Sequence, residues 1–270
     1  MTSLRNVLKE GKTQVGLCVM YPSPGVVERI GQDWDFIWID GQHGEMGYHD
    51  LLALVRACDF VRRPSLVRVP WHETGPIGQA LDMGATGVIV PCVDTAEQAQ
   101  AAVRAARFPP LGGRSYGGRR PIDLRGRGYA ATANEDTLLI VQIESPEAVR
   151  NADAIAAVPG VDALFLGPDD LFLRLGHNVE TASRNRDTMG ADLDAVVRAC
   201  RAHGKFGMTV GVGAAMFTLM RDAGFQLIVA GSDVAFLGNG SRQSAAEARA
   251  LLAGSAKPAA APAAQPPTPY

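Results

Sequence analysis

The side chains best suited to acid/base or metal chemistry follow short apolar stretches of this 270-residue sequence, and they are Asp40, His43, Arg68, Glu144 and Asp170. Asp40 and His43 stand on a glycine-containing turn after the apolar run 36–39. A carboxylate and an imidazole at this spacing could form an acid/base dyad in which the carboxylate fixes the ring tautomer. Ordinary surface acids in a loop would give the same pattern, so the prediction depends on whether the other residues lie nearby.

The other three residues indicate what such a dyad would act on. Glu144 and Asp170 suit a hard divalent cation such as Mg²⁺ or Mn²⁺, with the open positions taken by water and substrate oxygens. Arg68 would face a substrate carboxylate or a developing enolate oxygen, where a fixed cation stabilises negative charge. Each also has a structural alternative, because Glu144 and Asp170 could cap short helices and Arg68 could form an ion pair.

Apolar runs alternate with helical patterns along the chain, and this alternation predicts an α/β fold. Strands that are apolar at nearly every position are typical of a parallel sheet covered by helices. Eight units over about 250 residues favour a (β/α)8 TIM barrel, and no Gly-x-Gly-x-x-Gly motif follows the first strand to support a doubly wound sheet. In a barrel the carboxyl ends of all strands share one face, which would bring the five side chains together. The expected strands are 14–20, 36–39, 65–70, 86–91, 137–143, 161–166, 205–210 and 226–230.

The composition narrows the class of protein. The formal charge of −2 gives no nucleic-acid footprint, and no apolar run approaches the length of a membrane span. The amino-terminal residues lack the apolar core of a signal peptide, so we expect a cytoplasmic protein. We expect one folded domain over 1–253 with a last helix over 244–252, and a disordered Ala/Pro-rich tail over 254–270. The glycine- and arginine-rich interval 108–136 is predicted to be a long loop.

Short motifs that contain the candidate residues occur in a fixed order: Phe-Ile-Trp-Ile-Asp-Gly-Gln-His at 36–43, Val-Arg-Val at 67–69, Leu-Asp-Met-Gly-Ala at 81–85, Val-Pro-Cys-Val at 90–93, Val-Gln-Ile-Glu at 141–144 and Gly-Pro-Asp-Asp-Leu at 167–171. Together they resemble the HpcH/HpaI aldolase family, class II pyruvate aldolases on a modified TIM barrel. The resemblance spans nearly the whole chain, from residue 4 to residue 252.

The resemblance implies a role for each of the five residues. Glu144 and Asp170 would bind the metal, and Arg68 would stabilise the enolate. His43 with Asp40 would be the acid/base dyad, acting through a metal-held water. The metal would be Mg²⁺, Mn²⁺ or Co²⁺.

The resemblance also adds residues that the strand ends alone do not single out. Gln142 would support the site from its strand, and Gly167, Pro168 and Asp169 would contribute to substrate binding. Asp82 would reach the active site of a neighbouring subunit. The implied assembly is a hexamer, a trimer of dimers in which subunits exchange the last helix.

The sequence departs from the family pattern at a few positions. Gln42 stands where many relatives carry an acid, and Asp169 stands where a small residue is usual. Asp169 could therefore compete with Asp170 as a metal ligand. The segment 173–189 has no clear family pattern, so the aldehyde acceptor stays open.

The implied activity is reversible aldol cleavage of 4-hydroxy-2-oxo acids to pyruvate, or hydroxypyruvate, and an aldehyde. One alternative on the same fold is a lyase of the malyl-CoA or citramalyl-CoA type, for which the arginine-rich loop 114–127 could bind CoA phosphates. Another alternative is a non-catalytic barrel that binds an oxo acid.

The lysine positions decide between two aldolase mechanisms. A Schiff-base aldolase needs a lysine inside the barrel near the substrate. The chain has four lysines, of which Lys205 alone is expected beside a strand, at its amino end. Because that end is the wrong face, the sequence favours a metal over a Schiff base.

Overall fold

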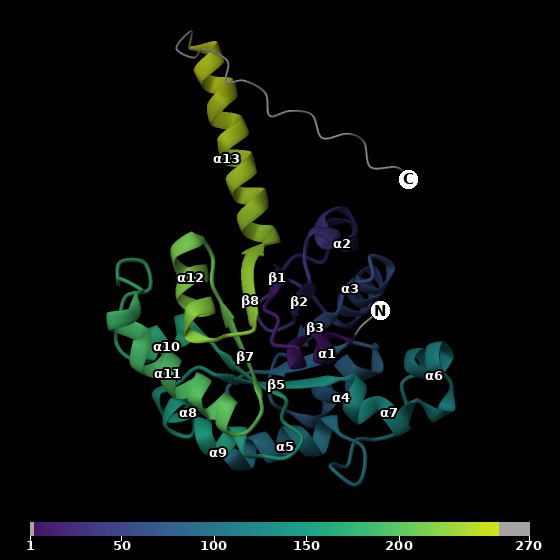
Figure 1. Cartoon of the computed structure of the whole chain (residues 1–270). Coiled ribbons are helices and arrows are strands. Elements are labelled where there is room, and N and C mark those ends of the chain that lie inside the picture. Colours follow the sequence, from purple (N-terminus) through teal and green to yellow (C-terminus); the bar gives the residue numbers. More distant parts are fainter. Residues whose placement is uncertain (1–2, 254–270) are drawn as a thin grey trace. The chain divides into compact units, whose positions relative to one another are not determined.

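The computed structural model describes residues 3–253, and these contain a closed barrel of parallel strands in sequential order from β1 to β8. Figure 1 shows the strands at the centre with helices around them. The predicted (β/α)8 TIM barrel is therefore confirmed. The strands are β1 Gln14–Val19, β2 Phe36–Asp40, β3 Ser65–Arg68, β4 Gly87–Val90, β5 Leu138–Ile143, β6 Ala163–Leu166, β7 Phe206–Val210 and β8 Leu227–Ser232.

The helices begin where the sequence supplies caps or proline. The Thr95 hydroxyl accepts from the backbone N–H of Gln98 at the start of α5, and the Ser145 hydroxyl caps α8 in the same way. The helical segments are α1 Leu4–Lys9, α2 Pro24–Ile30, η1 Gly31–Asp33, α3 Tyr48–Phe60, α4 Thr74–Asp82, α5 Ala96–Ala106, α6 Arg119–Arg125, η2 Arg127–Tyr129, α7 Ala130–Asp136, α8 Pro146–Arg150, α9 Ala152–Ala156, α10 Pro168–Arg174, α11 Arg186–Ala202, α12 Ala214–Ala223 and α13 Asp233–Leu252.

Each strand contributes to two apolar layers, because alternate side chains point to opposite faces. In β2, Ile37 and Ile39 belong to the outer core, whereas Phe36 and Trp38 belong to the interior cluster of the barrel. Both layers exclude water, which explains why the strand sequences are apolar at almost every position.

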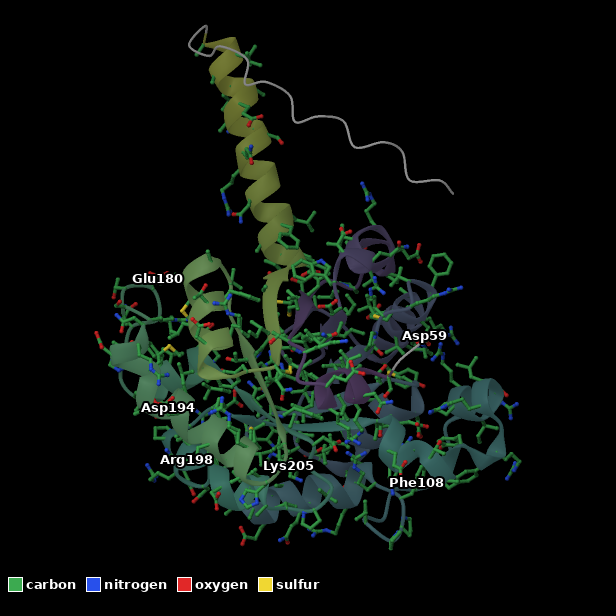
Figure 2. The ribbon with its side chains drawn as sticks, viewed as in Figure 1. Asp59, Phe108, Glu180, Asp194, Arg198 and Lys205 are labelled. Atoms are coloured by element: carbon green, nitrogen blue, oxygen red, sulfur yellow. The ribbon has the colours of Figure 1, made fainter. Side chains whose placement is uncertain are left out.

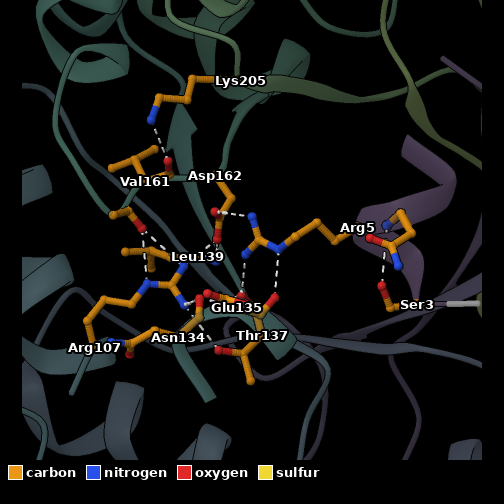
Figure 3. A network of polar contacts seen from close by, with 12 residues as sticks. Ser3, Arg5, Arg107, Asn134, Glu135, Thr137, Leu139, Val161, Asp162 and Lys205 are labelled. Carbon is orange, nitrogen blue, oxygen red and sulfur yellow. Dashed lines mark hydrogen bonds and ion pairs between the residues drawn. The ribbon is translucent and has the colours of Figure 1, made fainter. Parts of the chain in front are cut away.

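An ionic network holds α1 at the amino-terminal end of the barrel (Figure 3). Asp162, directly before β6, accepts from Arg5 Nη1 at 2.6 Å and also pairs with the guanidinium of Arg107. Arg107 donates to the carbonyl oxygens of Thr137 and Gly160. Burial lowers the pKa of Arg107, and the facing Asp162 carboxylate opposes that shift. The predicted site residues belong to the opposite end of the barrel, at the carboxyl ends of the strands.

Two predictions about the elements are wrong. The interval 108–136 contains α6, η2 and α7, which enclose a small cluster of Phe108, Tyr129 and Ala133. The last helix begins at Asp233 rather than at 244. In both regions glycines interrupt the apolar spacing on which the sequence prediction depends.

The described residues divide into two compact units, one that ends at Asp233 and one that begins at Val234. Among residues 3–253, no helix is both long and apolar enough to cross a membrane. The expected tail over 254–270 lies outside the described residues. A single domain through residue 253 and an exchanged last helix stay predictions.

Candidate active site

The predicted site residues stand at the carboxyl ends of four strands. Asp40 and Arg68 are the last residues of β2 and β3, and they are partners in the register of those strands. Glu144 follows β5 directly, and Asp170 lies in the first turn of α10 after β6. All four therefore belong to the barrel face that is opposite α1.

Asp40 and Arg68 form a buried, two-pronged ion pair. Arg68 Nε donates to Asp40 Oδ1 at 2.8 Å and Arg68 Nη2 donates to Oδ2 at 2.5 Å. The backbone N–H groups of Gln42 and His43 also donate to Asp40 Oδ1. Within residues 3–253, the Asp40 carboxylate makes no hydrogen bond to the His43 ring. The planar guanidinium of Arg68 matches the two carboxylate oxygens of Asp40, and this paired contact fixes the orientation of Arg68.

The network continues from Arg68 to the predicted metal ligand. Arg68 Nη1 donates to Gln142 Oε1 at 3.4 Å, and Gln142 Nε2 donates to Glu144 Oε2 at 2.6 Å. The Arg68 guanidinium also lies over the Trp38 ring, 4.7 Å from its centroid. These contacts fix the planes of both carboxylates and of the guanidinium, which is the preorganisation that a charged transition state needs.

Cys92 is a site residue that the sequence does not single out. Its backbone N–H donates to Glu144 Oε1 at 2.8 Å, and its φ of +56° is in the left-handed region. A non-glycine residue in this region is strained, and such strain concentrates at functional sites. Burial, with a further contribution from Glu144, raises the pKa of the Cys92 thiol to about 12. The only sequence signal is its position just after β4.

The donors at this face fit a hard divalent cation. Glu144 is 2% exposed, and within the described part of the chain neither Glu144 nor Asp170 forms an ion pair. Gly167 keeps space open above the carboxylate, because a Cβ there would lie 3.2 Å from Glu144 Oε2 and 2.8 Å from Gln142 Nε2. Within residues 3–253, no group of three or more His, Cys, Asp or Glu side chains is placed to hold a metal ion by protein ligands alone. Two carboxylates with water and substrate oxygens in the other positions is an arrangement that Mg²⁺ accepts.

A pocket of about 340 Å³ opens at this face and is lined by most of the predicted residues, namely Asp40, His43, Arg68, Gln142, Gly167, Pro168, Asp169 and Asp170. Asp169 differs from Asp170 in having an ion-pair partner. Its carboxylate pairs with Arg184 Nη1 at 2.5 Å, and its side chain is two-thirds exposed. The competition between Asp169 and Asp170 that the sequence raises is therefore weakened.

Asp82 does not join this pocket. It is the last residue of α4, and its carboxylate accepts from Arg114 Nη2 at 2.7 Å. It lines a separate hollow of about 560 Å³ together with Arg119 and Arg120. Its predicted function in a neighbouring subunit remains a prediction.

The lysine argument agrees with the geometry of the described residues. Lys205 precedes β7, and its Nζ donates to the carbonyl oxygen of Val161 at 2.8 Å. Figures 2 and 3 show this side chain at the end of the barrel where the ionic network lies. Burial lowers the pKa of Lys205, but its position at the amino-terminal end keeps it from a substrate in the pocket.

A parallel β/α barrel with an arginine–carboxylate network beside a pocket at the carboxyl ends of its strands defines a class of enzymes that act on small molecules. Comparison with known proteins identifies the family. The chain belongs to the HpcH/HpaI aldolase/citrate lyase family, whose model matches residues 21–239.

Relatives with named activities support the same assignment. A hydroxypyruvate/pyruvate aldolase of Rhizorhabdus wittichii is 32% identical over 93% of this chain and 100% of that protein. A 4-hydroxy-2-oxovalerate aldolase of Novosphingobium aromaticivorans is 44% identical over 63% of this chain and 66% of that protein. The crystal structure of a family member from Burkholderia cenocepacia superimposes with a TM-score of 0.83 at 34% identity, covering 92% of this chain and 100% of that one.

The predicted family and the predicted aldolase class, a carbon–carbon lyase, are confirmed by these relatives. The CoA-lyase alternative is not favoured.

Proposed function

We propose that this chain is a divalent-metal-dependent aldolase that reversibly cleaves 4-hydroxy-2-oxo acids to an aldehyde and pyruvate or hydroxypyruvate. The observation that carries the proposal is the continuous hydrogen-bond network from Asp40 through Arg68 and Gln142 to Glu144. It joins a fixed cation to a carboxylate that has no cationic partner within the described residues. The aldolase names of the relatives support the same reaction.

Glu144 and Asp170 would hold the cation, with Mg²⁺, Mn²⁺ and Co²⁺ as candidates. When bound, the cation would polarise the keto group of the substrate and stabilise negative charge on its oxygen. Gln142 would orient Glu144 through its 2.6 Å hydrogen bond.

Arg68 would receive the oxygen on which negative charge develops. Asp40 and Gln142 occupy three of its N–H groups, and the guanidinium has five. The remaining two are on Nη1 and Nη2, and Arg68 lines the pocket. Asp40 would hold the plane of the guanidinium.

His43 would be the base. Its side chain lines the same pocket and is not held by the Asp40 carboxylate. It would take the proton from the C4 hydroxyl as the C3–C4 bond breaks, which releases the aldehyde and leaves the bonding electrons in the enolate of the 2-oxo acid. Protonation of the enolate carbon completes cleavage, and the reverse sequence forms the carbon–carbon bond.

The test is an assay of 4-hydroxy-2-oxopentanoate cleavage, in which the released pyruvate is measured. Exhaustive EDTA treatment should abolish the activity, and Mg²⁺, Mn²⁺ or Co²⁺ should restore it. Borohydride added with pyruvate should leave the enzyme active, because no Schiff base forms. Full activity after exhaustive chelation would contradict the proposal.

A binding protein without catalysis is distinguished by proton exchange. An aldolase should exchange the methyl protons of pyruvate with D₂O in the absence of any aldehyde, which NMR detects. A barrel that only binds the oxo acid would leave the methyl group unlabelled.

The CoA-lyase alternative needs arginines of the loop 114–127 to bind the phosphates of CoA, but these arginines already have other contacts. Within the described chain each arginine there has a partner: Arg114 pairs with Asp82, Arg119 with Asp123, Arg120 with Asp59, Arg125 with Asp136, and Arg127 lies over the Tyr116 ring. Malyl-CoA and citramalyl-CoA should therefore not be cleaved.

The proposal also includes a homo-oligomer, in which Asp82 reaches the active site of a neighbouring subunit, and a cytoplasmic location.

A further inference from the structure

The pocket is divided into a polar half and an apolar half that come from different strands. The carboxyl ends of β2, β3 and β5, the turn after β2 and the first turn of α10 supply the polar half. Its polar side chains are Asp40, His43, Arg68, Gln142, Asp169 and Asp170. The opposite sector is formed at β7, β8 and β1, which are consecutive neighbours in the closed barrel. That apolar half consists of Cys18, Met20, Val210, Val212, Val229 and Gly231, and Ser232 at the end of β8 is its one uncharged polar side chain among the described lining residues.

The apolar half offers no counter-ion to an anionic ligand. Among the described residues that line the pocket, Arg68 is the one permanent cation, and Asp40 and Gln142 hold it in the polar half. Burial raises the pKa of the Cys18 thiol well above its ordinary value, so that side chain is uncharged.

A carboxylate instead lies behind the apolar half. Asp233 is 1% exposed and accepts from the backbone N–H groups of Met20 and Tyr21, at 3.1 and 3.0 Å. Its negative charge contributes to the raised pKa of Cys18, after burial and Asp40. An anion placed between Met20 and Val229 would lose water and meet this charge, both of which are costly.

The polar half also fixes where the two halves of the substrate lie. The cation and carboxylates of the polar half suit the 2-oxo acid of the proposed reaction. The substituent of the aldehyde must then point away from Arg68, towards β7, β8 and β1.

We infer that the aldehyde taken by this site is neutral, with an apolar substituent held by Met20, Val210, Val212 and Val229. The inference rests on the proposed function and names the substrate class of that same site. Val212 is the specificity-determining residue at its rim, because it lines the pocket and is 55% exposed.

Arg184 is the cation that most directly opposes this inference. It lies between α10 and α11, outside the pocket lining, and pairs with Asp169 at 2.5 Å. Its guanidinium also lies 5.4 Å from the centre of the Phe172 ring. Both contacts engage the guanidinium, and Arg184 is not among the residues that line the pocket, so the inference assigns it no contact with the aldehyde.

The test compares two aldehydes of nearly the same shape. In 4-methylpentanal an isopropyl group replaces the carboxylate of 4-oxobutanoate. With pyruvate as nucleophile, kcat/KM should favour 4-methylpentanal by roughly tenfold or more, which is what an apolar pocket discriminates. Equal values, or a preference for 4-oxobutanoate, would overturn the inference.

A positive charge introduced at the rim sharpens the comparison. Val212→Lys should shift the ratio of the two kcat/KM values towards 4-oxobutanoate by roughly tenfold. Leu111→Lys is the matched control, since Leu111 is 47% exposed and lies outside the pocket lining. The control should leave the ratio unchanged, and an equal shift in both variants would contradict the role of Val212.

Deuterium exchange into the methyl group of pyruvate keeps the two proposals separate. It needs no aldehyde, so its loss would count against the aldolase itself. Exchange together with a preference for 4-oxobutanoate would leave the aldolase intact and overturn only the neutral-aldehyde inference. If Arg184→Ala abolished that preference, Arg184 would be the recognising cation.

Discussion

Arg68 carries more of the proposed chemistry than any other single side chain, because its five N–H groups serve two purposes. Three hold the guanidinium to Asp40 and Gln142, and two remain for substrate oxygen. A lysine has the charge but neither the planar fork nor the reach to make all of these contacts.

We therefore expect Arg68→Lys to lower kcat/KM for aldol cleavage by about 10² to 10³, the usual loss when one charge-stabilising donor is removed. Steady-state kinetics on 4-hydroxy-2-oxopentanoate measure the effect. Arg104→Lys, at an exposed position of α5, is the control and should be neutral. An unchanged kcat/KM in Arg68→Lys would remove Arg68 from the mechanism.

Cys92 is predicted to act through its backbone rather than through its thiol. The left-handed φ of +56° directs its N–H to Glu144, and a β-branched side chain tolerates this conformation worst. Cys92→Val should therefore cost about 1–2 kcal/mol more of unfolding free energy than Cys92→Gly. Urea denaturation measures the difference. If Cys92→Gly is the less stable variant, the strained backbone is not what limits this position.

How far the sequence reveals these residues depends on the origin of each signal. Arg68, Glu144 and Asp170 are predictable because each follows an apolar run, and strand ends share one face. The partner of Asp40 is not predictable in this way. Spacing along the chain favours His43, whereas the β2–β3 register brings Arg68 beside Asp40. Cys92 escapes notice because the contact is made by its backbone.

At the scale of elements, the amino-terminal ionic network joins α1 to the start of β5 and β6. Asp162 is its centre, since it accepts from Arg5, Arg107 and the backbone N–H of Leu139. Arg107 is 1% exposed, so the loss of Asp162 would leave a buried guanidinium without its counter-charge.

Asp162→Asn should accordingly lower the free energy of unfolding by about 3–5 kcal/mol, the usual cost of breaking a buried ion pair. The urea midpoint reports the loss. Asp153→Asn is the matched control, because Asp153 is 76% exposed and pairs only with His203 among the described residues. Similar small losses in both variants would show that the network adds nothing to stability.

The elements themselves are predictable to different degrees. The eight strands follow from buried apolar runs because both of their faces exclude water. The helix α6 is hidden because it is a short, arginine-rich turn between Gly118 and Gly126. The helix α7 is hidden because its seven residues include only one buried side chain, Ala133, and so show no apolar stripe. For α13, Gly238 and Gly240 hide a helix that starts at Asp233.

At the scale of the whole molecule, the barrel would bind the proposed cation only when the ends of β5 and β6 are assembled. Glu144 follows β5 and Asp170 lies in α10 after β6, and the unfolded chain does not keep them together. A ligand that binds only the folded state stabilises it by mass action, about 2.7 kcal/mol at one hundred times its Kd. We therefore expect saturating Mn²⁺ to raise the Tm by roughly 5–10 °C.

Neutral variants of three carboxylates, two of them adjacent in the chain, test which side chains produce that shift. Asp170→Asn and Glu144→Gln should lose the Mn²⁺-dependent rise in Tm, because each removes one of the two proposed charged ligands. Asp169→Asn should keep the rise, since Asp169 pairs with Arg184 instead. Scanning calorimetry with and without Mn²⁺ measures this without any assay of activity. The opposite result, in which Asp169→Asn loses the rise and Asp170→Asn keeps it, would transfer the ligand to Asp169 and require the Arg184 ion pair to open when the metal binds.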